Sequence, residues 1–229
     1  MKTYAVIVAA GKSVRLGGAV PKQFRNICDR PMLAWTLSRF ETAASIDKIV
    51  IVVAEDALIY TGQNVVDRYG MSKVEKIVIG GESRRESVLR GLEALPVSTE
   101  LVAIHDGARP LVAPEDINRV VEVAARERAA MLAVPATDTI KRVKDGYILT
   151  TLDRTCLYQA QTPQVFQYDL ILTAHREADS SSPITDDASL VEAKGFKVRI
   201  VEPTAVNIKI TGADDLVMAE ALLRREGHE

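Results

Sequence analysis

Short, nearly continuous apolar runs alternate along the chain with segments whose apolar residues recur every three or four positions. The first run extends from Tyr4 to Ala9 and stops at Ala10-Gly11. Such runs are typical of strands buried on both faces, and the periodic segments between them are typical of amphipathic helices. The pattern predicts an α/β fold with a mainly parallel central sheet that helices cover on both faces.

Turn and cap residues divide this pattern into individual elements. Strands are expected over 4–9, 48–54, 74–79, 101–105, 131–135, 197–201 and 206–210. Helices are expected over 31–40, 56–69, 83–92, 114–128, from about 168, over 186–194 and over 213–225. Ser83 and Glu86 have the spacing of a capping box, Asp29 lies near the cap of the first helix, and Gly195 is a helix stop.

The alternation breaks at Ala136. The segments Asp138 to Val143 and Tyr147 to Leu152 flank Lys144-Asp145-Gly146, a typical hairpin turn in which Gly supplies a positive φ. An isolated hairpin is marginal in water, so this polar segment is expected to project from the sheet as an arm and to contact a second subunit. We therefore expect one domain over 1–229, with 136–161 as a dimerisation arm.

Composition narrows the range of partners. The 229 residues include 29 basic and 31 acidic side chains. This near balance of charge does not indicate a surface that binds nucleic acid or membrane. Cys28 and Cys156 lack the spacing of metal ligands, so no structural zinc site is expected. The first residues form a core strand rather than a signal peptide, and no apolar run reaches membrane-spanning length. We expect a cytoplasmic protein.

The loop after the first strand is the strongest candidate for chemistry. Small residues end the strand, and Lys12, Arg15 and Lys22 follow within one loop. A strand-to-loop transition of this kind presents backbone N–H groups and positive charge to polyphosphate, although it is neither a Walker loop nor a dinucleotide fingerprint. On the cations alone, a basic solvated loop fits equally well.

This loop resembles the signature of the sugar-phosphate nucleotidyltransferases, through Ala9-Ala10-Gly11, Arg15 and Pro21-Lys22-Gln23. Gln23 narrows the resemblance to the methylerythritol phosphate cytidylyltransferases of isoprenoid synthesis and the related ribitol-phosphate enzymes. The resemblance implies a Rossmann-like nucleotidyltransferase domain. It also implies that Ala9, Ala10, Gly11 and Ser13 hold CTP while Arg15 and Lys22 stabilise phosphate charge. Val8 and Ser13 depart from the common pattern, and neither departure removes a cation.

A second candidate segment, His105-Asp106-Gly107-Ala108-Arg109, follows the fourth strand. Ligands of open α/β sheets bind at the carboxyl ends of strands, where Asp106 could bind Mg²⁺ and Arg109 could grip phosphate. Alone, the segment fits a strand-ending turn better; together with the first loop it favours a metal site. The resemblance assigns Asp106 to metal and nucleotide, and Ala108 and Arg109 to substrate.

The resemblance also implies a base site and an acceptor site. Gly81 and Ser87 match residues that hold the pyrimidine, although Ser83 capping a helix and Gly80-Gly81 making a turn explain this segment as well. Arg154 and Lys209 match residues that position the acceptor phosphate, and Thr139 and Thr185 match acceptor contacts. From the residues alone, Arg154 is equally a solvated or dimer-pairing charge, and Thr185-Asp186 reads as a helix cap. Val206 stands where the family usually has a polar residue.

The expected reaction joins CTP to 2-C-methyl-D-erythritol 4-phosphate with Mg²⁺ and releases pyrophosphate. An acceptor phosphate oxygen would attack the α-phosphorus in line, so catalysis would depend on positioning and charge neutralisation. Two alternatives stay open: a ribitol-5-phosphate cytidylyltransferase and a non-catalytic nucleotide-binding regulatory protein. The full set of cations, together with Asp106, favours an enzyme.

Overall fold

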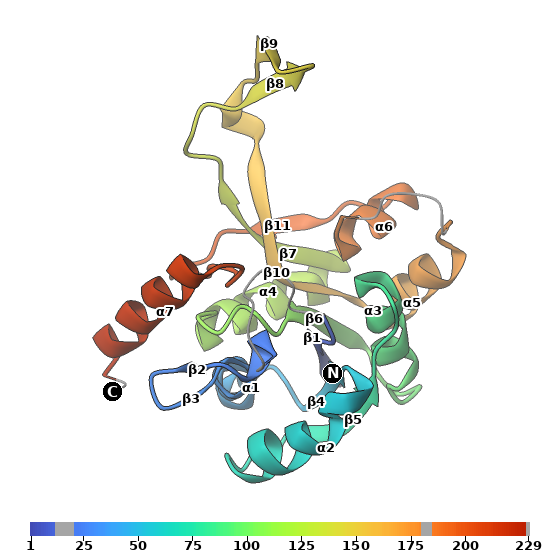
Figure 1. Ribbon diagram of the computed structural model, residues 1–229. Helices are drawn as coiled ribbons and strands as arrows, with labels where there is room; N and C mark the ends of the chain where they lie inside the picture. The colour runs from blue at the N-terminus through green and yellow to red at the C-terminus, as the bar shows by residue number, and fades with distance from the viewer. Residues whose placement is uncertain (12–20, 180–184, 228–229) are drawn as a thin grey trace.

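The computed structural model describes residues 1–11, 21–179 and 185–227, and a seven-stranded sheet forms its centre (Figure 1). In spatial order the strands are β11 (Arg199–Val201), β7 (Ala129–Pro135), β10 (Tyr158–Gln167), β6 (Leu101–Asp106), β1 (Thr3–Ala9), β4 (Lys48–Val53) and β5 (Val74–Ile79). β10 runs antiparallel to β6 and β7, and the other pairings are parallel. The predicted mainly parallel α/β sheet is confirmed.

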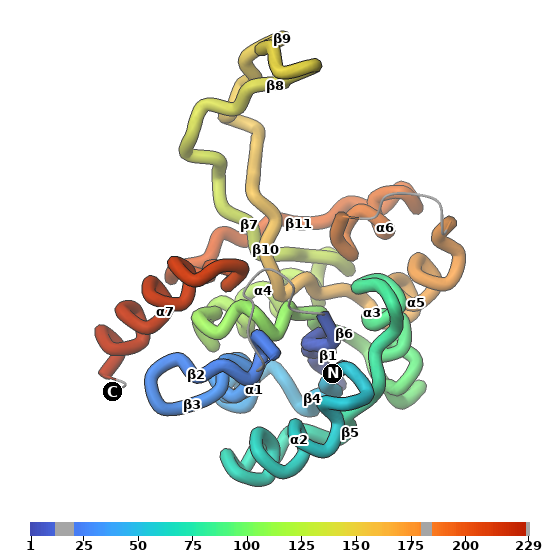
Figure 2. Tube along the Cα trace, in the orientation of Figure 1, coloured from blue at the N-terminus to red at the C-terminus, as the bar shows by residue number. Residues whose placement is uncertain are grey.

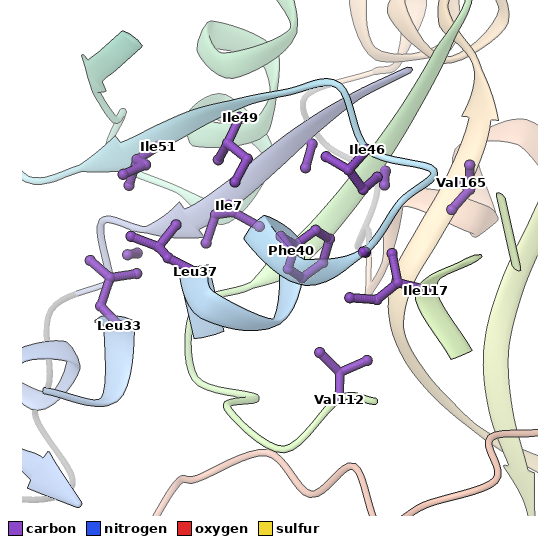
Figure 3. Close-up of a cluster of buried hydrophobic side chains, with 14 of the residues drawn as sticks. Ile7, Leu33, Leu37, Phe40, Ile46, Ile49, Ile51, Val112, Ile117 and Val165 are labelled. Carbon is purple, nitrogen blue, oxygen red and sulfur yellow. The ribbon is translucent and has the colours of Figure 1, made fainter. Parts of the chain in front are cut away.

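Alternate side chains of the strands enter two different cores. Ala5 and Ile7 of β1 belong to one apolar cluster, whereas Tyr4 and Val6 belong to the other. Figure 3 shows the first cluster, in which Phe40 lies against the strands. Helices that contribute to the first cluster are α1 (Met32–Thr42), α4 (Pro114–Glu127) and the stretch η2 (Glu55–Ala57), α2 (Leu58–Thr61) and η3 (Gly62–Asp67). Those of the second are α3 (Arg84–Glu93), α5 (Tyr168–Glu177) and α6 (Asp187–Ala193).

A smaller third cluster attaches the last helix, α7 (Ala213–Arg225), beside the main body. Its Leu223 packs in one cluster with Trp35 and Ile210, close to the short segments η1 (Lys22–Phe24), β2 (Asn26–Ile27) and β3 (Arg30–Pro31). The cluster therefore joins the segment that carries Lys22 to the segment that carries Lys209.

Local sequence signals explain most helix ends. The Ser83 hydroxyl accepts the Glu86 N–H at 3.1 Å, so the predicted cap of α3 is confirmed. Gly195 follows α6 with a φ of +80°, as expected for a helix stop. The cap expected near Asp29 is wrong, because Pro31 takes the N-cap position of α1 and no side chain caps this helix.

Two strand predictions need correction. β10 was not expected, since its sequence YQAQTPQVFQ is polar and contains Pro163. The strand expected over 206–210 is wrong: this stretch joins no ladder of the described sheet, and the Ile210 N–H donates instead to the Ala108 carbonyl at 2.8 Å.

The predicted hairpin is confirmed as β8 (Lys141–Lys144) and β9 (Tyr147–Thr151), at the end of an arm that extends from β7 and β10 (Figure 2). Asp145 and Gly146 have φ values of 50° and 82°, which is the backbone of a two-residue hairpin turn. A short turn, η4 (Arg154–Cys156), leads back toward β10. Every residue of β8 and β9 is exposed in the single chain.

No helix in the described part of the chain is both long and apolar enough to cross a lipid bilayer.

Candidate active site at the carboxyl ends of β1 and β6

A cavity of about 320 Å³ opens where β1 and β6 end and α3 begins. Nine residues that the sequence singled out line it: Ala9, Ala10, Gly11, Lys22, Gly81, Ser87, Asp106, Ala108 and Lys209. They come from five separate stretches of the chain, three of which follow strands at the carboxyl edge of the parallel sheet. The structure thus places the glycine loop, the acidic segment and two lysines around one space.

Asp106 is the electrostatic centre of this cavity. Its carboxylate lies 2.7 Å from the Lys209 ammonium, 3.2 Å from Arg84 Nε and 3.9 Å from Arg109 Nε. Burial alone would raise the pKa of Asp106, but the charges of Arg84 and Lys209 outweigh it and hold the pKa well below its usual range. Asp106 is therefore a carboxylate at any physiological pH.

The backbone behind Asp106 is fixed by a buried hydrogen-bonded chain. The Asp106 N–H donates to the Thr162 hydroxyl at 3.1 Å, and this hydroxyl lies 3.0 Å from His105 Nδ1. His105 Nε2 lies 3.1 Å from the Arg109 carbonyl, which can only accept, so Nε2 carries the proton and Nδ1 accepts from Thr162. The chain joins the end of β6 to β10.

Arg109 lies behind the cavity rather than on its wall. It is 9% exposed, and its Nη1 donates to the Asn207 carbonyl at 2.8 Å. The Asn207 amide donates in turn to Gln161 Oε1 at 3.0 Å and to the Thr162 carbonyl at 2.9 Å. Arg109 therefore ties the segment before Lys209 to the loop after β6, and Asn207 ties the same segment to the base of the arm. The predicted contact of Arg109 with substrate stays a prediction.

Lys22 reaches the cavity from η1 because the following Phe24 is buried in the first core cluster. The Lys22 ammonium donates to the Ile210 carbonyl at 2.7 Å. The neighbouring Lys209 points to Asp106, whereas Ile210 is fully buried, so successive side chains face opposite ways even without a strand. Two ammonium groups therefore converge on the cavity wall.

Gly80 and Gly81 leave no space for larger side chains. A Cβ on Gly80 would lie 2.4 Å from the Ala10 Cβ, and a Cβ on Gly81 would lie 2.3 Å from the Glu86 side chain. Ser87 is buried beside them, and its hydroxyl accepts the Gly81 N–H at 3.1 Å. This packing brings polar backbone to the surface of the cavity, where a flat ring could lie against it.

Three predicted acceptor residues are not brought to the cavity within the described part of one chain. Thr139 and Arg154 are exposed on the arm, where Arg154 Nη1 donates to the Thr137 carbonyl. Thr185 is exposed, two residues before α6. Ser13 and Arg15 lie outside the described residues.

Sequence reasoning missed three residues. Arg84 lines the cavity and joins Asp106 to Asp187 of α6 through ion pairs of 3.2 and 2.8 Å. Asp187 is also 3.1 Å from His175 Nε2 of α5. The paired positions stand 22, 103 and 12 residues apart in the sequence, so no local pattern could connect them. Two adjacent arginines at the start of α3 were the available signal.

The donor set fits a magnesium ion that is held mostly by phosphate. The described residues contain no group of three or more His, Cys, Asp and Glu side chains arranged around a metal position. Mg²⁺ usually takes one or two carboxylates together with substrate phosphates and water. Asp106 supplies one ionised carboxylate on the cavity wall, and the Lys209 side chain beside it is 40% exposed and thus has space to move.

Comparison with known proteins identifies the family of the chain. A family model described as 2-C-methyl-D-erythritol 4-phosphate cytidylyltransferase matches residues 3–225. A protein of that name from Pelotomaculum thermopropionicum is 45% identical over 229 residues, covering 99% of this chain and 96% of its own length. Another from Desulforamulus reducens is 45% identical over 223 residues, covering 96% and 95%.

Solved structures agree in fold over the same length. The 4-diphosphocytidyl-2C-methyl-D-erythritol synthase of Anaerococcus prevotii superposes with a TM-score of 0.86 at 30% identity, covering 97% of this chain and 96% of that one. The 2-C-methyl-D-erythritol 4-phosphate cytidylyltransferase of Thermus thermophilus gives 0.77 at 35% identity, covering 96% and 98%.

Proposed function

Because the chain belongs to the 2-C-methyl-D-erythritol 4-phosphate cytidylyltransferase family, we propose that it transfers the cytidylyl group of CTP to 2-C-methyl-D-erythritol 4-phosphate. The products are 4-diphosphocytidyl-2-C-methyl-D-erythritol and pyrophosphate, and the reaction serves isoprenoid precursor synthesis. The similarity extends over nearly the full length of both partners, which favours this acceptor over ribitol 5-phosphate.

One observation carries the proposal: an ionised carboxylate, Asp106, shares a cavity wall with Lys22, Lys209 and Arg84. A polyphosphate needs several cations, and in-line transfer at phosphorus needs charge neutralised on both sides of the reacting atom. A binding module without turnover would not require cations of this number around a carboxylate.

The cavity suggests how CTP lies in it. The cytosine ring rests against Gly81 on the cavity wall, where backbone carbonyls accept from its amino group and Ser87 supports the loop. The triphosphate follows the end of β1 across Ala10 and Gly11 toward Lys22. This pose directs the α-phosphorus to the space between Lys22 and Lys209.

The chemistry exchanges one P–O bond for another. An oxygen of the acceptor phosphate forms a bond to the α-phosphorus, the bond from this phosphorus to the bridging oxygen of the β-phosphate breaks, and pyrophosphate leaves with that electron pair. The attacking phosphate is already ionised near neutral pH, so no side chain has to act as a strong base. Lys22 stabilises negative charge on the transferred group and pyrophosphate, and Lys209 orients the acceptor phosphate. Arg15 has the same predicted role as Lys22.

Asp106 is the residue that would hold Mg²⁺, with the triphosphate as the other ligand. When bound, the ion neutralises phosphate charge and favours departure of pyrophosphate. Lys209 and Arg84 keep the Asp106 carboxylate ionised before the nucleotide arrives.

The arm provides the acceptor site of a partner subunit. Val143, Tyr147, Ile148 and Leu149 of the hairpin are between 55% and 78% exposed in the single chain. An isolated two-stranded sheet with this much apolar surface is marginal in water, and a symmetric dimer would cover it. Thr139 and Arg154 would then reach the partner's cavity. The cytoplasmic location also stays a prediction from the sequence.

Pyrophosphate release tests the proposed reaction. Purified protein with Mg²⁺ is mixed with each of four nucleoside triphosphates and with methylerythritol phosphate or ribitol 5-phosphate. We expect turnover with CTP and methylerythritol phosphate at a kcat/KM well above that of every other pair. Faster turnover with ribitol 5-phosphate would assign the alternative acceptor, and binding of CTP without turnover would indicate a regulatory protein.

Mixing two inactive variants tests the shared site. Lys22→Ala removes a cation from the cavity, and Arg154→Ala removes one from the arm. If Arg154 serves the partner's cavity, exchanged subunits regain activity because a mixed dimer holds one intact site. Exchange without recovery would place Arg154 in the site of its own subunit.

A further inference from the structure

A buried ionic chain extends from the Asp106 carboxylate away from the cavity. The Arg84 guanidinium donates to Asp106 Oδ1 through Nε at 3.2 Å and to Asp187 Oδ2 through Nη2 at 2.8 Å. His175 Nε2 lies 3.1 Å from Asp187 Oδ1, so it donates to the second oxygen of this carboxylate. The chain joins α3, α5 and α6, which lie together on one side of the sheet (Figure 1).

The inner end of this chain is fully enclosed. The Asp187 side chain is 1% exposed and the His175 side chain 0%, whereas the Arg84 side chain is 31% exposed and lines the cavity. Burial opposes ionisation of Asp187, but Arg84 and His175 outweigh it and lower the pKa of its carboxyl. A buried ion pair is weak evidence for stability, since apolar residues of similar volume often stabilise as well or better. A role in the site explains this chain better.

We propose that Asp187 is a positioning residue for cytidylyl transfer: held by His175, it fixes the Arg84 guanidinium against Asp106 and so orients the carboxylate that faces the nucleotide. This inference rests on the proposed function, because it gives Asp106 its task there. It also connects the nucleotide side of the cavity with the start of α6.

The geometry explains why a carboxylate is needed at position 187. Its two oxygens accept from two different donors, Arg84 Nη2 and His175 Nε2. Asparagine offers one oxygen and one NH₂ group, so one donor would face another donor. Arg84 likewise uses two different nitrogens to bond Asp106 and Asp187. Lysine would have a single nitrogen for these two carboxylates, which lie on two sides of the guanidinium.

Arg85 provides a matched control on the same helix. Its Nη2 donates to the His175 carbonyl at 3.2 Å and to the Ala178 carbonyl at 2.5 Å, so it also ties α3 to α5. No bond joins Arg85 to Asp106 or Asp187 among the described contacts. A variant of Arg85 therefore reports on the helix tether alone.

The test compares Asp187→Asn with Arg85→Gln in the full chain. We expect Asp187→Asn to lower kcat/KM for CTP roughly ten- to hundredfold, as loss of a residue that orients a ligating group does. The KM of the acceptor and the activity of Arg85→Gln should stay near the parent values. Arg84→Lys should behave like Asp187→Asn. His175→Gln keeps a donor near Nε2 and should retain activity, whereas His175→Leu should lose it.

A second readout does not depend on turnover. The ¹⁵Nε–¹H signal of Arg84, assigned by its loss in Arg84→Lys, reports the bond to Asp106. We expect it to be shifted and protected from solvent exchange in the parent, and exchange-broadened in Asp187→Asn and His175→Leu but not in Arg85→Gln.

The outcomes separate the two claims. An unchanged Arg84 signal in Asp187→Asn, or equal kinetic losses in Asp187→Asn and Arg85→Gln, would overturn the positioning role. If Asp187→Asn does not fold, the variants His175→Gln, His175→Leu and Arg84→Lys test the positioning role by the same kinetic and NMR measurements. Absence of cytidylyl transfer by the parent would instead refute the proposed function, and the Arg84 signal would then decide whether Asp187 holds Arg84.

Discussion

Lowering the pH should destabilise the protein through His105. This side chain is fully buried at the end of β6, and burial lowers its pKa to about 3 from 6.5, although the Arg109 carbonyl and Asp106 partly oppose the shift. Since the folded-state pKa is the lower one, the unfolded chain binds more protons between these values. Stability is therefore fully present above about pH 6.5 and is lost as the pH falls toward 3.

The size of the effect follows from the shift. One pH unit within this window changes the unfolding free energy by about 1.4 kcal/mol for one group. Between pH 6.5 and pH 5, His105 should therefore remove about 2 kcal/mol. A loss of this size is a large fraction of the marginal stability of a domain.

The assay is urea unfolding of the parent and of His105→Gln at a series of pH values. Glutamine does not titrate in this range and can still donate to the Arg109 carbonyl. The other titrating groups are common to both proteins. The difference between the slopes of their unfolding free energies against pH therefore isolates the contribution of His105. If the unfolding free energies of the two proteins change with pH in parallel, or if the parent gains stability on acidification, His105 is not a neutral buried imidazole. The assignment of its hydrogen bonds behind Asp106 would then also be wrong.

Three further outcomes follow from the geometry of the cavity. Gly80→Ala should lower the free energy of unfolding by about 1 to 3 kcal/mol through overpacking, as measured by urea unfolding. The control Gly62→Ala, whose Cβ would meet only one atom at 3.8 Å, should be neutral or stabilising. Asp106→Asn should weaken CTP binding in Mg²⁺ but much less without it; equal metal dependence in calorimetry would place the ion elsewhere. Lys22→Ala should lower kcat at least about a hundredfold while the melting temperature holds, and the exposed Lys197→Ala should be silent in the same pyrophosphate assay.

The centre of the parallel sheet could be predicted because its strands β1, β4 and β6 are buried on both faces. The runs at 49–54 and 101–104 are apolar throughout, which is typical of strands buried on both faces. The strand β10 carries no such signal, because Gln159, Gln161 and Gln164 make it polar. Its first half belongs to the exposed arm, and its second half is buried between β6 and β7. Only the partners on either side, β6 and β7, make this segment a strand.

The stretch before α7 gave the opposite error. Val206, Ile208 and Ile210 alternate with polar residues, a period typical of a strand, yet they pair with no strand among residues 1–11, 21–179 and 185–227. Ile208 and Ile210 pack against α7 instead, and the alternation still directs Lys209 to the cavity. Alternating side-chain directions therefore persist here without a strand.

The site residues fall into two groups: those in short sequence motifs and those joined only by contacts between distant parts of the chain. Residues within short motifs, such as Gly81 and Asp106, could be chosen from the sequence, and the structure brings them to one cavity. Asp187 could not be chosen in this way, because its partners come from α3 and α5. Its neighbours in the sequence are typical of an ordinary helix start. Long-range ion pairs leave no periodic trace in one sequence.

Product analysis with an ¹⁸O-labelled acceptor tests the central claim most directly. Methylerythritol phosphate with ¹⁸O in its non-bridging phosphate oxygens is incubated with CTP, Mg²⁺ and the protein, and the products are weighed by mass spectrometry. Attack of the acceptor phosphate on the α-phosphorus predicts 4-diphosphocytidyl-2-C-methyl-D-erythritol that retains every labelled oxygen, with unlabelled pyrophosphate in equal amount. Label in the pyrophosphate, release of CMP without the cytidylyl product, or no reaction would contradict the account.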